Sequence, residues 1–320
     1  MPSREKILVS VLAAIFVISF GRFLIENARF PIYNETGVFS EGFVGQIRNI
    51  NPLFVDFNDT DRDISKLIFS GLIKYDPLQK NFLPDLAEKW ERSSNGLVYK
   101  FILRPNIFWH DETPVTAEDV VFTFKDVIQD PEFRNPILKN TFEGIEITTT
   151  PANEIIFKLQ RSNSYFISNL TVGLLPKHLQ NSNNKLPIGT GPYKVTSFDL
   201  DSDGDELNLE SFSKYYGPKP SIEKMRIFTF PNEKSLIQQK DSLHAVGKLN
   251  LANEMTKLVA NDPRFTPYTY TLNQFTALHF NINNSFLNEQ KFRKAIALTL
   301  NKQTLIKDGE KRIDALDLED

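Results

Sequence analysis

The chain has 320 residues, of which 41% are hydrophobic and 24% charged, and this composition suits a globular protein with room for two domains. A net charge of −3 argues against the basic surface of a nucleic-acid-binding protein, so no nucleic-acid partner is expected. The absence of cysteine excludes disulfides, thiol catalysis, cysteine-ligated metals and the acylated cysteine of a bacterial lipoprotein.

The N-terminus predicts a membrane-targeting segment over residues 1–28. Arg4 and Lys6 precede an unbroken apolar run from Ile7 to Phe20, which fits a signal peptide or a short anchor helix. Because the sequence around the run offers only a poor small-residue cleavage site, we favour an uncleaved anchor in the membrane over a cleaved signal peptide. In both cases the basic residues stay inside, and the rest of the chain is placed outside the cytoplasmic membrane.

The remaining chain alternates helical and strand patterns, which predicts a mixed α/β fold. Capping-box spacings at Thr60/Asp63 and Thr116/Asp119 predict helices over 60–76 and 116–128. Further helices are expected at 84–90 and 288–307, whereas residues 26–45 show no clear period. Alternating residues predict strands at 96–105, 192–200, 206–213 and 275–283, and a strand pair over 144–160.

One stretch, residues 199–210, satisfies the EF-hand calcium pattern with Asp199, Asp201, Asp203 and Glu210 as candidate oxygen ligands. A strand precedes this loop where a helix would be needed, and Glu206 occupies a position that is normally apolar. An acidic hairpin turn between two strands is therefore favoured, with a calcium-stabilised surface domain as the alternative.

The sequence shows no catalytic constellation, and we expect neither enzymatic activity nor a cofactor. The four histidines stand apart from one another, without a metal-ligand spacing. The Ser221–Lys224 stretch matches the Ser-x-x-Lys of penicillin-recognising enzymes, but the companion boxes of that family are absent.

Seven stretches, in order along residues 40–306, resemble the family 5 extracellular solute-binding proteins, the peptide and nickel receptors of ABC importers. They are INPLF (50–54), RDISKLIFSGLIKYDP (62–77), LPDLAEKWERSSNGLVYKFILRPNIFWHDETPVTAEDVVFTF (83–124), NLTVGLLPKHL (169–179), PIGTGPYKV (187–195), LESFSKYYGPKPSIEKMRI (209–227) and FNINNSFLNEQKFRKAIALTLNKQTLI (280–306). The chain departs from the family at KDSLHAVG, where a Gly-Glu-Ile-Asp motif is usual, and at HDET, where His-Asp-Gly is usual.

The resemblance implies a type II (cluster C) periplasmic-binding-protein-like fold, with mixed sheets and flanking helices. Residues 29–58 and 186–275 would form the main lobe, 59–185 a peripheral lobe with part of lobe I, and 276–320 the start of a second ligand-clasping lobe that is otherwise largely missing. Most of the clasping lobe would then be absent, and Phe292, Ile296, Leu298 and Leu300 would leave an apolar face uncovered.

The function implied is capture of di- or oligopeptides by a monomer that delivers them to ABC permease subunits. A nickel or other small-solute receptor of the same family is the alternative. Thr60, Asp61, Arg62, Thr190 and Tyr193 are the expected ligand-binding residues; capping by Thr60 and hinge packing by Thr190 and Tyr193 are the competing interpretations. Gly189, Gly191 and Pro192 would shape a bend where the chain returns to the main lobe, the glycines by adopting backbone angles closed to other residues.

Overall fold

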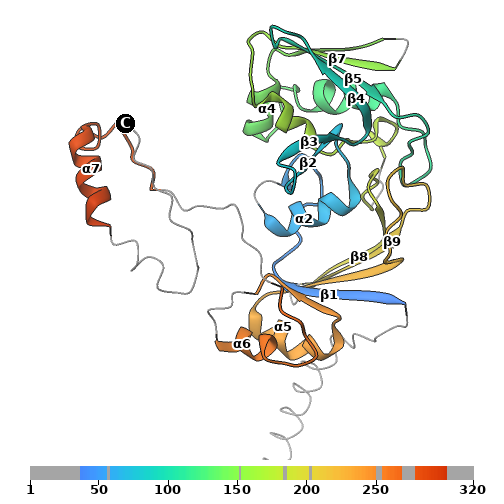
Figure 1. Ribbon diagram of the computed structural model, residues 1–320, viewed down its shortest axis with the longest axis vertical. Coiled ribbons are helices and arrows are strands. Elements are labelled where there is room, and N and C mark those ends of the chain that lie inside the picture. Colours follow the sequence, from blue (N-terminus) through green and yellow to red (C-terminus); the bar gives the residue numbers. More distant parts are fainter. Residues whose placement is uncertain are drawn as a thin grey trace, which may run out of the picture.

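The computed structural model describes residues 37–55, 58–150, 153–182, 186–201, 204–249, 254–268 and 278–300 (Figure 1). The predicted anchor, residues 1–28, lies outside this part of the chain. None of the helices within the described ranges is long and apolar enough to cross a membrane.

A five-stranded sheet forms the lower part of the body in Figure 1, in the order β11-β1-β10-β9-β8. β1 lies parallel to both β10 and β11, whereas β9 is antiparallel to its two neighbours. The strands are β1 (Val38–Val44), β8 (Tyr193–Asp201), β9 (Gly204–Ser211), β10 (Lys224–Phe230) and β11 (Ala245–Gly247). This sheet therefore joins segments that lie on either side of a long intervening stretch of sequence.

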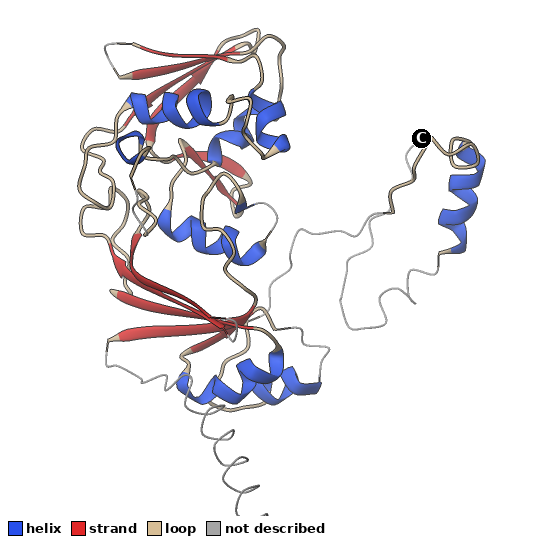
Figure 2. Ribbon diagram, turned by 180° about the vertical axis from the view of Figure 1, so that it is seen from behind, coloured by secondary structure: helices blue, strands red, loops and turns tan. Residues whose placement is uncertain are grey.

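Helices cover both faces of the five-stranded sheet. On one face, Ile64 and Ile68 of α2 (Asp59–Ile68) pack into a core with Phe43, Tyr193 and Leu207. On the other face, α5 (Glu233–Gln239) buries Leu236 against Phe228 and Phe230 of β10, and α6 (Glu254–Ala260) lies beside it (Figure 2). The result is a three-layer unit.

The segment between α2 and β8 forms a second unit with its own aromatic core. Its four-stranded antiparallel sheet has the order β4-β5-β7-β6, and a separate hairpin pairs β2 with β3. Phe101, Phe124, Phe142, Phe157 and Phe166 are fully buried there and stack in tilted or edge-to-face pairs. Its elements are β2 (Ile73–Asp76), β3 (Asn81–Pro84), β4 (Ala87–Arg92), β5 (Val98–Leu103), α3 (Ala117–Val121), the π-helical turn Phe122–Val127, α4 (Pro136–Phe142), β6 (Glu146–Thr149), β7 (Glu154–Lys158) and the short 3-10 helices Phe166–Thr171 and Lys177–Leu179.

The last described helix, α7 (Gln290–Thr299), stands apart from both units (Figures 1 and 2). None of its residues is buried, and Phe292, Ile296, Leu298 and Leu300 are all exposed to solvent in the part of the chain that the structure describes. The only aromatic partner found for Phe292 in that part is Phe286, at a ring-centroid distance of 5.8 Å.

Several predicted elements are confirmed. The strands at 96–105, 192–200 and 206–213 and the pair at 144–160 appear as β5, β8, β9 and β6–β7. The helix beginning after Thr116 is present, and the Thr116 amide donates to Asp119 Oδ2 at 2.8 Å, as in a capping box.

Three predicted elements are wrong or overlong. Residues 84–90 form no helix: Pro84 ends β3, and residues 87–90 belong to β4, where cross-strand pairing of Trp90 with Phe101 outweighs local helix propensity. The helix predicted over 60–76 ends at Ile68, and 73–76 pairs as β2. Residues 278–283 form no strand, while 275–277 lie outside the described residues.

Candidate functional site

The bend at 187–195 lies where the two units meet, and main-chain hydrogen bonds anchor it on both sides. The Gly191 amide donates to the Ile68 carbonyl at the end of α2 at 2.8 Å. The His110 amide, from the second unit, donates to the Gly189 carbonyl at 2.9 Å. The bend is therefore a fixed joint between α2, the second unit and β8.

The imidazole of His110 completes this joint from a buried position. The Gly189 amide donates to His110 Nδ1 at 3.2 Å, so that Nδ1 is the acceptor and Nε2–H donates to the Gly191 carbonyl at 3.0 Å. Burial lowers the pKa of His110 from 6.5 to about 4. A neutral imidazole therefore clamps the bend at neutral pH, and His110 is a core histidine and not a metal ligand.

The reason for the two glycines differs from the one predicted. Neither Gly189 nor Gly191 has a positive φ, so special backbone angles do not explain them. A Cβ at Gly189 would lie 2.0 Å from the Ile68 carbonyl oxygen, and one at Gly191 would lie 2.6 Å from the Leu67 carbonyl oxygen. Glycine is needed because the backbone of the bend packs directly on the backbone of α2.

The structure gives Thr190 and Tyr193 structural partners. Thr190 is buried, and its Oγ1 accepts the Ser70 amide hydrogen at 3.3 Å. Tyr193 is also buried, and its hydroxyl donates to the Ile222 carbonyl at 3.1 Å. Burial raises the pKa of Tyr193 above its usual 10. Ligand contact by these two residues stays a prediction.

At the other end of α2, the N-cap is Asn58 and not Thr60. The Asn58 side chain accepts from the Thr60 amide at 3.0 Å, because the helix begins two residues earlier than the capping-box spacing predicts. Thr60 is buried, and its hydroxyl occupies the space that a side chain at Gly45 would need. Thr60 and Thr190 thus lie at opposite ends of α2.

Asp61 and Arg62 are adjacent in sequence but differ in environment. Asp61 is 2% exposed, and its carboxylate accepts the amide hydrogens of Arg48 and Asn49 at 2.9 and 3.1 Å. Arg62 is partly exposed and pairs with Asp59 at 2.5 Å. Asp61 therefore fixes the backbone of the preceding loop by accepting its amide hydrogens. A direct contact of Asp61 or Arg62 with ligand stays a prediction.

The acidic 199–210 stretch is the hairpin of β8 and β9. Asp199 lies opposite Glu206, and Glu210 lies opposite Lys194, so Glu210 is roughly 13 Å further along the sheet at ~3.3 Å per residue. This regular strand pairing favours the acidic hairpin turn over a loop folded around one calcium ion, whose ligands must all lie within about 2.3–2.6 Å of it. Asp203 and the side chain of Asp201 lie outside the described residues, so a role for these two as calcium ligands stays a prediction.

Sequence reasoning missed two buried carboxylates that hold distant segments. Asp205 Oδ2 accepts the Ile47 amide hydrogen at 2.7 Å. Asp85 Oδ1 accepts from the Tyr216 hydroxyl at 2.6 Å, and burial raises the pKa of this carboxyl. Neither contact has a local sequence signal, because the partners are far apart along the chain. Across the described ranges, no three histidine, aspartate or glutamate side chains are grouped to hold a metal ion.

Comparison with known proteins decides the family. The model of the bacterial extracellular solute-binding proteins, family 5, matches residues 81–312. The chain belongs to this family. It has the type II periplasmic-binding-protein-like fold of the family, with mixed sheets and flanking helices.

Individual relatives of this family 5 protein are distant. The oligopeptide-binding protein AppA of Bacillus subtilis is 23% identical over 83% of this chain and 50% of its own length. The dipeptide-binding protein of Escherichia coli is 25% identical over 82% and 54%. The structure of NikZ from Campylobacter jejuni in complex with Ni(L-His) matches with a TM-score of 0.65 and 25% identity, over 85% of this chain and 55% of that one. The chain thus spans about half the length of the relatives it matches.

Proposed function

We propose that this protein captures di- or oligopeptides outside the cytoplasmic membrane and delivers them to the permease of an ABC transporter. The observation that carries the proposal is family membership together with the curated relatives, which are named for oligopeptide and dipeptide binding. The protein would act as a binding protein and not as an enzyme, without a cofactor.

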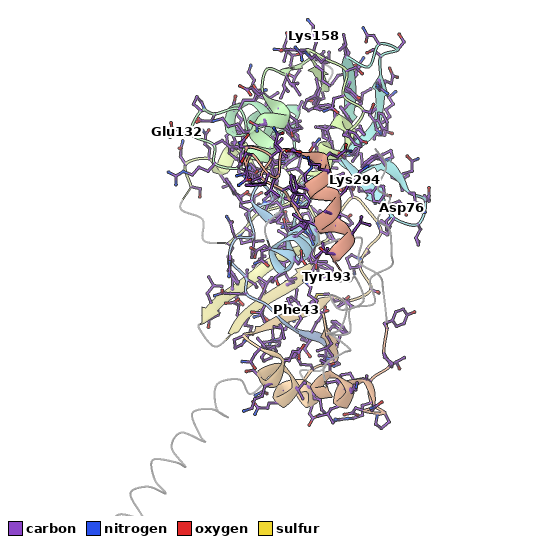
Figure 3. All side chains as sticks on the ribbon, turned by 90° about the vertical axis from the view of Figure 1, so that its left-hand side faces the viewer. Phe43, Asp76, Glu132, Lys158, Tyr193 and Lys294 are labelled. Atoms are coloured by element: carbon purple, nitrogen blue, oxygen red, sulfur yellow. The ribbon has the colours of Figure 1, made fainter. Side chains whose placement is uncertain are left out.

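The proposal includes the organisation expected from the sequence. Residues 1–28 would anchor a monomer to the membrane, and the permease subunits would be its partners. The main lobe would comprise 29–58 and 186–275, the peripheral lobe 59–185, and the second clasping lobe would begin at 276. The ligand would be held on the side of the body from which α7 stands off, which faces the viewer in Figure 3. Arg62 and the loop that Asp61 fixes are the candidate contacts.

Titration calorimetry of the purified chain with a pool of di- to pentapeptides tests this function. Peptide binding should also raise the melting temperature, since a ligand at about 100 times its Kd stabilises the folded state by roughly 2.7 kcal/mol. Absence of both binding heat and a thermal shift with every peptide would overturn the proposal.

A receptor for nickel or another small solute is the second candidate. It is favoured by the structural match to NikZ, whose complex holds Ni(L-His). Titration of the same chain with nickel and L-histidine, in the absence of peptides, separates the two. Binding in that titration, together with no response to the peptide pool, would replace the first proposal by the second.

A further inference from the structure

The strand β11 lies at one edge of the five-stranded sheet and is very short. It has three residues, and within the described ranges it pairs with β1 alone. Its attachment to the sheet therefore depends strongly on the contacts at its two ends. At the far end, Lys248 Nζ lies 2.8 Å from Asp63 Oδ2 of α2 and 4.8 Å from the centre of the Phe43 ring.

The near end of β11 is attached to β1 through an imidazole. The His244 amide donates to the Ser40 carbonyl at 2.9 Å, and the Ser40 amide donates back to His244 Nδ1 at 3.1 Å. Ser40 Oγ lies 2.8 Å from the same nitrogen, and the ring stacks on Phe39 at a centroid distance of 5.8 Å. The imidazole thus accepts a β1 amide hydrogen, as a backbone carbonyl does in a continued ladder.

This contact requires an Nδ1 without a hydrogen. A backbone amide can only donate, so Nδ1 must accept and the ring hydrogen lies on Nε2. Protonation adds a hydrogen to Nδ1. The imidazolium can then donate to Ser40 Oγ, but the Ser40 amide loses its acceptor. Because Ser40 is 3% exposed, water does not replace that acceptor, and a buried amide without a partner destabilises the contact.

The charged groups around this contact do not hold His244 in its protonated form. In the part of the chain that the structure describes, His244 forms no ion pair. The charged side chains nearest in sequence belong to one network, made of Lys240, Asp241, Asp262 and Arg264. On β1, the Glu41 carboxylate lies against Gly247, at the far end of β11. Burial raises the pKa of Glu41, so its protonation in acid favours the folded state and is not a source of loosening.

We propose that His244 is an acid-sensitive attachment of β11, which holds the strand to β1 when neutral and releases it when protonated. Imidazoles change charge between about pH 5 and 8. His244 lies in the KDSLHAVG stretch, where the chain departs from its family and the usual Gly-Glu-Ile-Asp motif contains no histidine.

The inference goes beyond the proposed function, because it depends on no particular solute. β11 is the last strand that the structure describes before α6 and α7. The protonation state of His244 therefore sets how firmly the segment that leads to these helices is attached to the sheet.

Hydrogen exchange of the full chain at pH 7.5 and 5.5, followed by mass spectrometry, tests the switch. Protection factors, corrected for the intrinsic exchange rate at each pH, are compared between peptides that cover β11 and β10. Because β10 lies inside the sheet, it reports any general loss of stability, including the part due to His110. The protection of β11 relative to β10 should fall about tenfold to a hundredfold at pH 5.5, as the loss of a buried hydrogen bond predicts. An unchanged ratio overturns the inference.

Three variants assign the change to its source. His244→Asn keeps an acceptor near the position of Nδ1 that takes up no proton, so the ratio should no longer depend on pH. His279→Asn, at an exposed histidine, is the matched control and should behave like the wild type. Lys248→Met removes the attachment at the far end and should lower the ratio at both pH values. A pH dependence that persists in His244→Asn overturns the inference.

A second measurement on the wild type decides the matter if His244→Asn is itself loose at both pH values. Nitrogen-15 NMR of the imidazole nitrogens follows their protonation, and the signals absent from His244→Asn identify His244. At pH 7.5 its Nδ1 should carry no hydrogen, and the midpoint of its protonation should coincide with that of the loss of β11 protection. A neutral ring with the hydrogen on Nδ1, or two separate midpoints, overturns the inference.

Discussion

His110 and Gly189 hold each other by two reciprocal hydrogen bonds. The His110 amide donates to the Gly189 carbonyl at 2.9 Å, and the Gly189 amide donates to His110 Nδ1 at 3.2 Å. Because Nδ1 faces a donor, it can take a proton only if this contact breaks. The joint between the two units is therefore built for a neutral histidine.

We expect the joint to weaken in mild acid. The pKa of His110 is about 4 in the folded chain and 6.5 ordinarily, a difference that corresponds to roughly 3 kcal/mol of stability. This stability is fully present above pH 6.5 and is lost as the pH falls towards 4, because the unfolded chain binds the proton first. Urea denaturation between pH 7.5 and 4.5 measures it.

A substitution separates His110 from the other titrating groups. His110→Gln should be less stable at pH 7.5 and should lose less stability than the wild type on acidification. His279→Gln is the control, since His279 is exposed. An equal pH slope in His110→Gln and in the wild type would refute this assignment.

Gly189→Ala should destabilise the chain through a backbone clash. The new Cβ would meet the Ile68 carbonyl oxygen at 2.0 Å, so α2 or the bend must shift, at a cost of about 1–3 kcal/mol or more. Gly37→Ala is a useful comparison, because Gly37 has φ +89° but open space around it, so that only backbone strain of about 1–2 kcal/mol is expected there. Thermal unfolding measures both, and a smaller loss at Gly189 than at Gly37 would contradict the close-packing explanation.

Asp61→Asn should cost about 2–3 kcal/mol, because two loop amides lose a charged acceptor in a buried place. Asp59→Asn, in the same helical turn, removes one partner of a partly exposed ion pair with Arg62 and should change the free energy of unfolding by less than about 1 kcal/mol. Chemical denaturation compares the two variants. Similar losses would show that Asp61 has no special structural role.

Tyr216→Phe should be more damaging at pH 7 than at pH 4. Burial raises the pKa of Asp85, while the hydrogen bond from Tyr216 counteracts this by stabilising the charged form. Without the hydroxyl the charged carboxylate is less favourable, so a loss of about 1–3 kcal/mol is expected at neutral pH and less when Asp85 is protonated. Denaturation at both pH values, with the exposed Tyr165→Phe as control, checks the sign. A loss independent of pH would speak against it.

Sequence patterns predicted the elements whose burial follows a simple period. β5, with buried Tyr99, Phe101 and Leu103, alternates as a strand with one covered face does. β1 was missed, because a strand in the middle of a sheet covered on both sides loses that alternation, and Ser40 and Glu41 interrupt its apolar residues.

The candidate site was less predictable than the fold. The glycines and prolines of residues 187–195 predicted a bend. No sequence pattern around His110 indicates that its side chain contacts this bend. The same holds for Asp61 and Asp205, whose task is to accept backbone amides from residues 47–49. Such contacts depend on chain segments that meet only in the folded protein, so no local pattern reports them.

The placement of β1 has a consequence for the order of events during synthesis. Val38 pairs with Lys224, and Gly42 with Val246, so β1 lies between two strands that leave the ribosome long after it. The second unit, whose strands are neighbours in sequence, can assemble before β10 and β11 are synthesised. Until then β1 has no strand to pair with. Such distant parallel pairing slows folding and leaves strand edges open to aggregation. A chaperone that protects unpaired strands of the nascent chain should therefore bind residues 38–44, and release of this segment should coincide with the synthesis of β10.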